Sequence, residues 1–288
     1  MGGQVQVVRS IDEVRSLARA ARSAGSTIGL VPTMGALHAG HARLIEEARR
    51  ECHATVVSIF VNPLQFDRPD DLERYPRTLE ADRDMCRSLG VDFVFAPPAH
   101  EMYPAPPACT VGVDRLGDHL CGRFRPGHFR GVATVVAKLF NIVQPDRAYF
   151  GEKDAQQLAV VRRLVVDLTM PVQIVGVPTV REPDGLALSS RNRLLAPQER
   201  ESATALYRAL LEADRQIAAG ARDPARVKAA AAALIPHTDS LRLEYLDIVD
   251  PDDMQPVARI GGPVCVAGAL WVGSTRLIDN VLSTPPAG

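Results

Sequence analysis

Short apolar runs rich in β-branched residues alternate with helical segments over residues 10–177 of this chain. Strands are predicted at 27–31, 56–61, 91–96, 148–150 and 172–177. Helices are predicted at 10–24, 41–50, 78–89, 131–143 and 154–168. The run at 56–61 is almost entirely apolar, which is typical of a strand buried on both faces of a sheet. The alternation therefore predicts an α/β fold with a doubly wound parallel sheet.

The pattern changes beyond residue 185. One long helix is predicted at 197–219 and another at 225–234, followed by extended segments at 241–249 and 264–272. Helices followed by consecutive strands predict a smaller α+β domain. We therefore expect a Rossmann-like domain at 1–185 and the α+β domain at 186–288. Within the first domain, the strand at 27–31 is expected to end before Pro32, and the proline-rich stretch 97–107 is expected to be irregular.

The charges of the chain balance, with 33 lysine and arginine residues against 34 aspartate and glutamate residues. The formal net charge of -1 argues against a broad nucleic-acid-binding face and against a polybasic membrane anchor. No run of about 18 uncharged apolar residues occurs, and the N-terminus lacks a signal-peptide stretch. The five cysteines are widely spaced without a C-x-x-C pair, as expected of reduced thiols. We predict a cytoplasmic protein with no nucleic-acid or membrane partner.

The segment Pro32–His41 joins the first predicted strand to the helix that follows it. Parallel sheets bind ligands beyond the carboxyl ends of their strands, and a helix N-terminus offers N–H groups to phosphate. Gly35 and Gly40 let the backbone approach a ligand closely, while His38 and His41 can project to one side. The chain has neither a P-loop nor a dinucleotide-binding glycine motif. A role of the histidines as caps of the turn stays open, and zinc is disfavoured because no third ligand has a recognisable spacing.

The H-x-G-H element His38–His41 resembles the signature of the nucleotidyltransferase superfamily, and the longer run Pro32–His41 resembles the pantothenate synthetase family. Five further segments are similar to that family in the same order, at 58–66, 75–78, 125–131, 150–157 and 181–192. The resemblance implies an AMP-forming ligase that condenses (R)-pantoate with β-alanine. Such a ligase uses ATP, passes through a pantoyl adenylate and releases AMP and pyrophosphate. The resemblance also implies a homodimer, and Mg²⁺ accompanying ATP.

Formation of an adenylate needs positioning and positive donors more than covalent protein chemistry. Lys153 is one of only three lysines and lies in the Gly-led turn 151–154, which favours a phosphate contact over a surface role. The resemblance implies that His38 is the proton donor. The residues it implies for catalysis are His38, His41, Lys153, Ser189, Ser190 and Arg191. For ATP binding it implies, in addition, Met34, Gly35, Ala36, Leu37, Ala39, Gly40, Gly151, Glu152, Asp154, Val180 and Leu188.

Three amide side chains are implied to bind the substrates pantoate and β-alanine. Asn62 and Gln65 follow the strand predicted at 56–61, and Gln157 lies one helical turn after Lys153. Amides can hydrogen-bond hydroxyls and a carboxylate without adding charge. Simple capping of the strand and the helix remains the alternative for all three.

The sequence offers few candidate ligands for Mg²⁺. Mg²⁺ is usually held by few protein carboxylates. The resemblance carries over Asp82 alone, because Ala81 stands where relatives often have Asp. The roles of Arg125 and His128 stay open between a segment that covers the site and an ordinary surface loop. The resemblance also implies that residues 186–288 act as a lid.

Two other functions fit parts of the sequence. A nucleotidyltransferase that makes a dinucleotide cofactor is disfavoured by the three amides and by the Ser-Ser-Arg loop at 189–191. A catalytically dead relative with a binding role is disfavoured because the histidines, Lys153 and Arg191 are all present. A serine nucleophile is unsupported, since no G-x-S-x-G elbow surrounds Ser189 or Ser190.

Overall fold

The computed structural model describes residues 5–286, which divide into two compact units. The first unit holds residues 5–113, 125–152 and 160–178, and the second holds 114–124, 153–159 and 179–286. The second unit thus includes the segments 114–124 and 153–159, and also residues 179–185, all of which precede the predicted boundary. The lid role of residues 186–288 stays a prediction.

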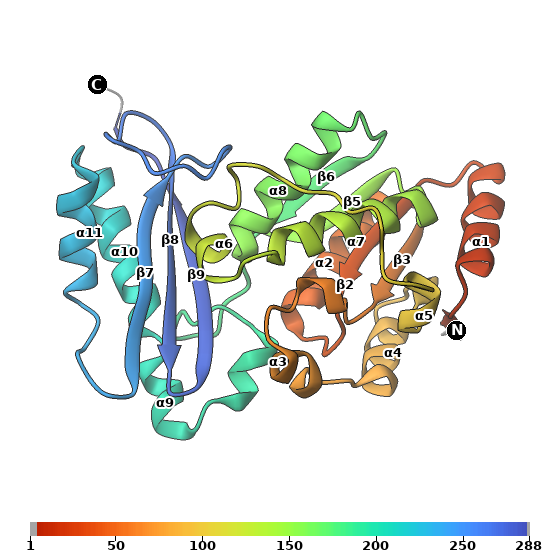
Figure 1. The fold of residues 1–288 in the computed structure, drawn as a ribbon, viewed down its shortest axis with the longest axis horizontal. Helices are drawn as coiled ribbons and strands as arrows, with labels where there is room; N and C mark the ends of the chain where they lie inside the picture. The colour runs from red at the N-terminus through yellow and green to blue at the C-terminus, as the bar shows by residue number, and fades with distance from the viewer. Residues whose placement is uncertain (1–4, 287–288) are drawn as a thin grey trace. The chain divides into compact units, whose positions relative to one another are not determined.

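The first unit is built on a six-stranded parallel sheet with the strand order β1-β4-β3-β2-β5-β6 (Figure 1). Its strands are β1 Gln6–Val8, β2 Ile28–Thr33, β3 Ala54–Ile59, β4 Phe93–Phe95, β5 Arg147–Gly151 and β6 Gln173–Val177. The longer helices are α1 Ile11–Ser23, α2 Ala39–Glu51, α4 Leu79–Ser88, α7 His128–Val143 and α8 Ala155–Asp167. The predicted doubly wound α/β fold is confirmed, with the short edge strand β1 added to the five predicted strands.

Both faces of this sheet are buried. Ile45 of α2 and Cys86 of α4 pack in one apolar cluster with Val57 of β3. The next residue back along β3, Val56, points to the opposite face and is 1% exposed. The nearly continuous apolar run of β3 therefore reflects a strand covered by helices on both sides.

Strand β2 continues through Pro32, so the prediction that it ends before this residue is wrong. Pro32 pairs with Ser58 of β3, and the carbonyl of Thr33 accepts the N–H of Phe60 at 3.0 Å. Because successive residues of a strand direct their backbone groups to opposite sides, Pro32 faces β5. The pairing of β2 with β5 ends at Leu30, so no ladder bond is lost at the proline.

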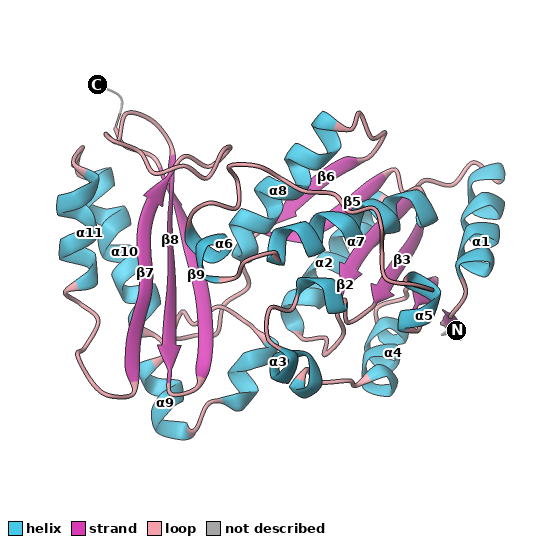
Figure 2. Cartoon of the chain, viewed as in Figure 1, coloured by secondary structure: helices cyan, strands magenta, loops and turns pink. Residues whose placement is uncertain are grey.

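The second unit contains a three-stranded antiparallel sheet with the order β7-β8-β9, packed against two helices (Figure 2). The strands are β7 Leu241–Val249, β8 Val264–Val272 and β9 Thr275–Ser283, and the helices are α10 Ala205–Ala218 and α11 Pro224–Ala232. Leu206 and Leu210 of α10 share a buried cluster with Val266 and Leu270 of β8. Strand β9 was not predicted, because Asp279 and Asn280 interrupt its apolar pattern.

The long helix predicted at 197–219 is two helices, α9 Pro197–Ser202 and α10. The hydroxyl of Thr204 donates to the carbonyl of Glu201 at 3.0 Å at the break. Hydroxyl side chains that bond nearby carbonyls compete with the helical backbone ladder, which accounts for the interruption.

Short elements complete the described chain. They are α3 Pro69–Arg74, α5 Ala99–Met102, α6 Leu120–Phe124, and the 3₁₀ turns η1 Pro63–Gln65, η2 Glu152–Asp154 and η3 Ser190–Leu194. Helix α5 lies in the stretch that was predicted to be irregular. Over residues 5–286, none of the helices has the length and apolar character needed to span a bilayer.

Candidate active site

The two histidines of the H-x-G-H element begin helix α2. Nδ1 of His38 accepts the N–H of Gly40 at 3.1 Å, and Nδ1 of His41 accepts the N–H of His38 at 3.3 Å. A ring nitrogen that accepts a hydrogen bond carries no proton, so in each neutral ring the proton lies on Nε2. The ring centroids are 4.1 Å apart. Capping and ligand binding are therefore compatible, since Nδ1 caps the helix while Nε2–H is a donor at its positive end.

The loop before these histidines is held by a buried carboxylate. Gly35 and Ala36 both have left-handed backbone conformations, with φ of 83° and 51°. Asp82 accepts the N–H of Ala36 at 3.0 Å and that of Leu37 at 2.8 Å, and it also accepts the hydroxyl of Thr78 at 3.1 Å. These bonds compensate for a conformation that a non-glycine residue rarely adopts.

These contacts point to a different role for Asp82 from the predicted magnesium ligand. The residue is 2% exposed, and both of its oxygens are bonded to protein donors. No group of three or more His, Cys, Asp or Glu side chains among residues 5–286 is placed to hold a metal ion. The described residues therefore do not form a protein cage for Mg²⁺, and Asp82 acts as the anchor of the loop.

The turn after β3 brings the amides Asn62 and Gln65 together. The side-chain Nδ2 of Asn62 donates to Oε1 of Gln65 and to the carbonyl of Gly131, both at 3.1 Å. Oδ1 of Asn62 accepts the hydroxyl of Tyr103 at 3.0 Å and the N–H of Leu64 at 3.4 Å. With both N–H groups and both lone pairs in use, Asn62 holds its neighbour in place.

Gln65 has a weaker partner than Asn62. Its Nε2 donates to the thioether sulfur of Met34 at 3.1 Å, which links this turn to the loop before α2. A thioether is a weak acceptor. A carboxylate or hydroxyl oxygen of a ligand would replace it favourably, so Gln65 is the amide of this pair that is suited to bind substrate.

Helix α7 fixes the backbone of the same turn. Nδ1 of His128 lies 2.8 Å from the carbonyl oxygen of Gln65, and Nη2 of Arg125 donates to that oxygen at 3.2 Å. A Cβ on Gly131 would lie only 2.2 Å from the carbonyl oxygen of Leu64. These contacts give Arg125 and His128, whose roles the sequence left open, a place in holding Gln65.

Lys153 lies in the 3₁₀ turn η2, which follows β5 and leads into α8. Its side chain is 18% exposed, and its Nζ is 3.8 Å from Oδ2 of Asp154. A lysine that is mostly covered yet opens into a pocket differs from a solvated surface lysine. Gln157 lies partly buried in the first turn of α8, and Gly151 and Glu152 lie at the carboxyl end of β5.

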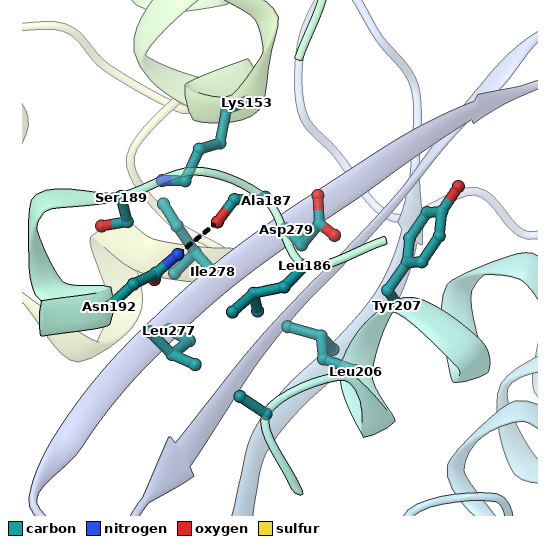
Figure 3. A pocket seen from close by; sticks show the side chains of 11 residues that line it. Lys153, Leu186, Ala187, Ser189, Asn192, Leu206, Tyr207, Leu277, Ile278 and Asp279 are labelled. Carbon is teal, nitrogen blue, oxygen red and sulfur yellow. Dashed lines mark hydrogen bonds between the residues drawn. The ribbon is translucent and has the colours of Figure 1, made fainter. Parts of the chain in front are cut away.

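The Leu188–Arg191 loop is closed on itself and on the preceding hairpin. The hydroxyl of Ser189 accepts the N–H of Arg191 at 3.2 Å, and the carbonyl of Val180 accepts the N–H of Leu188 at 2.9 Å. Asn192 clamps the loop, since its Nδ2 donates to the carbonyl of Ala187 at 3.0 Å (Figure 3).

A pocket in the second unit brings part of the predicted set together. Lys153 and Ser189 line it from one side, with Asn192 and Asp279 among the other lining residues (Figure 3). The aliphatic part of the lining comes from Leu186, Leu206 and Leu277. The first unit in turn brings together the loop 34–41, Asn62 and Gln65.

Four residues that line the pocket or hydrogen-bond to members of these two groups were not predicted: Asn192 and Asp279 line the pocket, Tyr103 bonds to Asn62, and Asn280 bonds to Lys153. Burial raises the pKa of Tyr103 to about 12, so its hydroxyl stays protonated as the donor to Asn62. Asn192 directly follows the loop, and Asp279 with Asn280 lies within an otherwise apolar strand. Two polar residues within an apolar strand indicate buried hydrogen bonds, and this signal is visible in the sequence.

Comparison with known proteins supports the resemblance over the whole chain. A family model described as pantoate-beta-alanine ligase matches residues 6–282. Proteins named pantothenate synthetase from Moorella thermoacetica and Thermotoga petrophila are 52% and 49% identical to the chain. Each match covers 96% of this chain, and 98% and 99% of the two relatives.

Solved structures agree with these matches. Pantothenate synthetase from Thermus thermophilus has a TM-score of 0.92 at 47% identity, over 98% of this chain and 100% of its own. The enzyme from Francisella tularensis, complexed with beta-gamma ATP and beta-alanine, has a TM-score of 0.80 at 34% identity, over 96% and 97%. The chain therefore belongs to the pantoate-beta-alanine ligase family.

Proposed function

We propose that this ligase condenses pantoate with β-alanine in two steps. The pantoate carboxylate attacks the α-phosphorus of ATP, and pyrophosphate leaves as pantoyl adenylate forms. The amine of β-alanine then attacks the acyl carbon, and AMP leaves. The overall ATP-dependent condensation agrees with the family match and with the relative that is complexed with beta-gamma ATP and beta-alanine.

The observation that carries this proposal is the paired histidines at the start of α2. Negative charge grows on the bridging and pyrophosphate oxygens as the α-phosphorus is attacked. His38 and His41 offer Nε2–H donors and the positive end of a helix to that charge. His38 is assigned as the proton donor, and residues 34–37 with Ala39 and Gly40 are assigned as the backbone cradle of ATP.

Lys153 and the Ser189–Arg191 loop are assigned to the phosphates. A lysine is a compact charge on a flexible stem that can follow a phosphate through the reaction. Its position in one pocket with Ser189 supports a shared ligand. The remaining ATP contacts proposed are Gly151, Glu152, Asp154, Leu188 and the backbone of Val180 for adenine.

Gln65 and Gln157 are assigned to pantoate, with Gln65 also serving β-alanine. Asn62 is assigned an indirect role, because its amide is fully bonded to the protein. Mg²⁺ is expected to accompany ATP, and no step is assigned to it because the described residues offer no ligand set. A homodimer is proposed from the family resemblance alone. Cytoplasmic location is supported by five free thiols, which are typical of a reducing compartment.

The test is pantoate-dependent exchange of labelled pyrophosphate into ATP, measured before β-alanine is added. Exchange with pantoate alone, followed by AMP release when β-alanine is supplied, is the expected result. Lys153→Ala should lower exchange by about 100-fold or more. Lys228→Ala is the matched control, because Lys228 pairs with Asp247 elsewhere in the same unit and should leave exchange unchanged. Folded protein with Mg²⁺, ATP and pantoate but no exchange would overturn the proposal.

A further inference from the structure

Strand β9 carries two adjacent polar residues that are almost fully buried. Asp279 is 5% exposed and Asn280 is 8% exposed. Burying a carboxylate and an amide is unfavourable unless both are hydrogen-bonded. The partners of these two residues therefore indicate why a strand of the small sheet holds them.

Asp279 forms a two-bond ion pair with Arg181. Nη1 and Nη2 of Arg181 donate to the two carboxylate oxygens at 2.6 and 3.0 Å, and Nη1 also donates to the carbonyl of Gly185 at 3.0 Å. The guanidinium lies 4.0 Å from the ring centroid of Tyr207. Such a bidentate pair fixes both the position and the orientation of Arg181.

Arg181 begins the hairpin that leads into the Leu188–Arg191 loop, which is proposed to bind phosphate. It forms a backbone bridge with Ala187, and the residue before it, Val180, accepts the N–H of Leu188. The ion pair with Asp279 therefore holds the base of the Leu188–Arg191 loop against β9.

Asn280 binds the turn that contains Lys153, which is the other element proposed to bind phosphate. Its Nδ2 donates to the backbone carbonyl of Lys153 at 2.9 Å. The Asn280 N–H also donates to Oδ1 of Asp279 at 2.8 Å, and the Asn280 carbonyl accepts Nη2 of Arg181 at 3.3 Å. One pair of residues on β9 thus binds both the Lys153 turn and the Arg181 hairpin.

We infer that Asp279 and Asn280 are positioning residues for adenylation, because they hold Lys153 and the Ser189–Arg191 loop at a fixed separation around one pocket (Figure 3). The inference rests on the proposed function, since it assigns no contact with substrate to either residue. Positioning of charged donors governs phosphoryl-group reactions, so a small displacement of Lys153 lowers turnover.

The same sheet contains a matched control. Arg276 donates to Glu244 at 2.9 and 2.6 Å in an ion pair whose side chains are 15% and 8% exposed. The Arg181–Asp279 side chains are 19% and 5% exposed, so the two pairs are alike in burial and in the number of charged hydrogen bonds, although both donors of Arg276 meet the same oxygen of Glu244. Glu244 and Arg276 do not line the pocket that contains Lys153.

The first experiment compares Asp279→Asn, Asn280→Ala and Glu244→Gln by pyrophosphate exchange and thermal unfolding. The first two variants should lose about 10- to 100-fold in kcat of exchange, with KM for pantoate within about twofold of wild type. Glu244→Gln should lose less than about threefold in kcat, at an equal or larger loss of Tm. If Asp279→Asn does not fold, Asn280→Ala, which removes a neutral amide, carries the test. Equal loss of kcat in all folded variants would overturn the inference.

A double-mutant cycle tests whether Asn280 acts through Lys153. Asn280→Ala should have less than about a threefold effect in the Lys153→Ala background, because the group that it positions is gone. A full, multiplicative loss in that background would overturn the inference and leave a general structural role. Absence of exchange in wild type would instead overturn the proposed function, and the inference with it.

Discussion

The carboxylate of Asp82 accepts the backbone N–H of Leu37 at 2.8 Å, from a residue 45 positions earlier in the chain. It accepts the N–H of Ala36 and the hydroxyl of Thr78 as well, so helix α4 sets the shape of the loop that leads into α2. The loop supplies backbone donors and the two histidines to the proposed ATP site. Asp82 therefore holds the backbone of this loop through helix α4.

Replacing Asp82 with Ala should leave two backbone N–H groups and a hydroxyl without their acceptor. We expect a loss of about 2–4 kcal/mol in the free energy of unfolding, measured by urea denaturation, and a large loss of exchange activity. The Mg²⁺ concentration for half-maximal exchange should not change. Asp84→Ala on the exposed face of α4 is the control, expected within about 0.5 kcal/mol of wild type. A shifted Mg²⁺ requirement in Asp82→Ala would restore its predicted role as a metal ligand.

Gly131→Ala should displace the turn that carries Gln65. An alanine inside a helix would ordinarily stabilise it by about 0.5–1 kcal/mol relative to glycine. Here the added Cβ would lie 2.2 Å from the carbonyl oxygen of Leu64, a backbone atom that cannot move freely. We expect the clash to dominate, with a net loss of about 1–3 kcal/mol and weaker pantoate binding. Gly112→Ala, where no atom lies within 4 Å of the added Cβ, should have no such effect.

Substitutions of Gln65 and of Asn62 should weaken pantoate binding for different reasons. Gln65→Ala is expected to raise KM for pantoate by about 10-fold or more, because a ligand contact is lost. Asn62→Ala should also weaken binding, but the double variant should lose little more than Gln65→Ala alone, since Asn62 acts by holding Gln65. Multiplicative losses measured in steady-state kinetics would show instead that Asn62 contacts the substrate itself.

Thiol reactivity should follow burial. Cys109 is exposed, whereas the other four cysteines are buried. Burial raises the pKa of Cys86 and of Cys265 from 9.0 to about 12, and only the thiolate is nucleophilic. Iodoacetamide at about pH 8 should therefore modify one thiol in the folded protein and none in Cys109→Ser. Mass spectrometry that finds Cys86 modified without unfolding would contradict the packing of α4.

The raised pKa values of the Cys86 and Cys265 thiols also predict how the free energy of unfolding changes with pH. Above pH 9 the unfolded chain releases these protons, while the folded chain retains them up to about pH 12. Stability is therefore full below about pH 9 and falls as the pH rises beyond it. Urea denaturation at about pH 8 and about pH 10 should show this decrease, and Cys86→Ala should reduce the difference between the two.

The local pattern of the chain was sufficient for most of the fold. Buried strands such as β3 leave an apolar run because helices cover both faces, and β7 and β8 were predicted with the observed bounds. The H-x-G-H element and the Ser-Ser-Arg loop were also visible, because each is contiguous. The predicted end of β2 was wrong because pairing between distant strands decides it. Strand β2 continues through Pro32, since its pairing with β5 ends at Leu30 and Pro32 has no hydrogen bond to lose on that side.

The order of residues along the chain was enough for the fold class, the family resemblance and the two contiguous motifs that are proposed to bind phosphate. The polar residues that support those motifs became evident in the folded chain. Asp82 to Leu37, Asn62 to Gly131 and Asn280 to Lys153 are hydrogen bonds between residues far apart in the chain. A periodic pattern reports which face of an element is buried, but it does not report which distant donor a buried polar group will meet. Those partners follow from packing, which places Asp82 against the loop before α2 and residues of β9 in the lining of the pocket that contains Lys153.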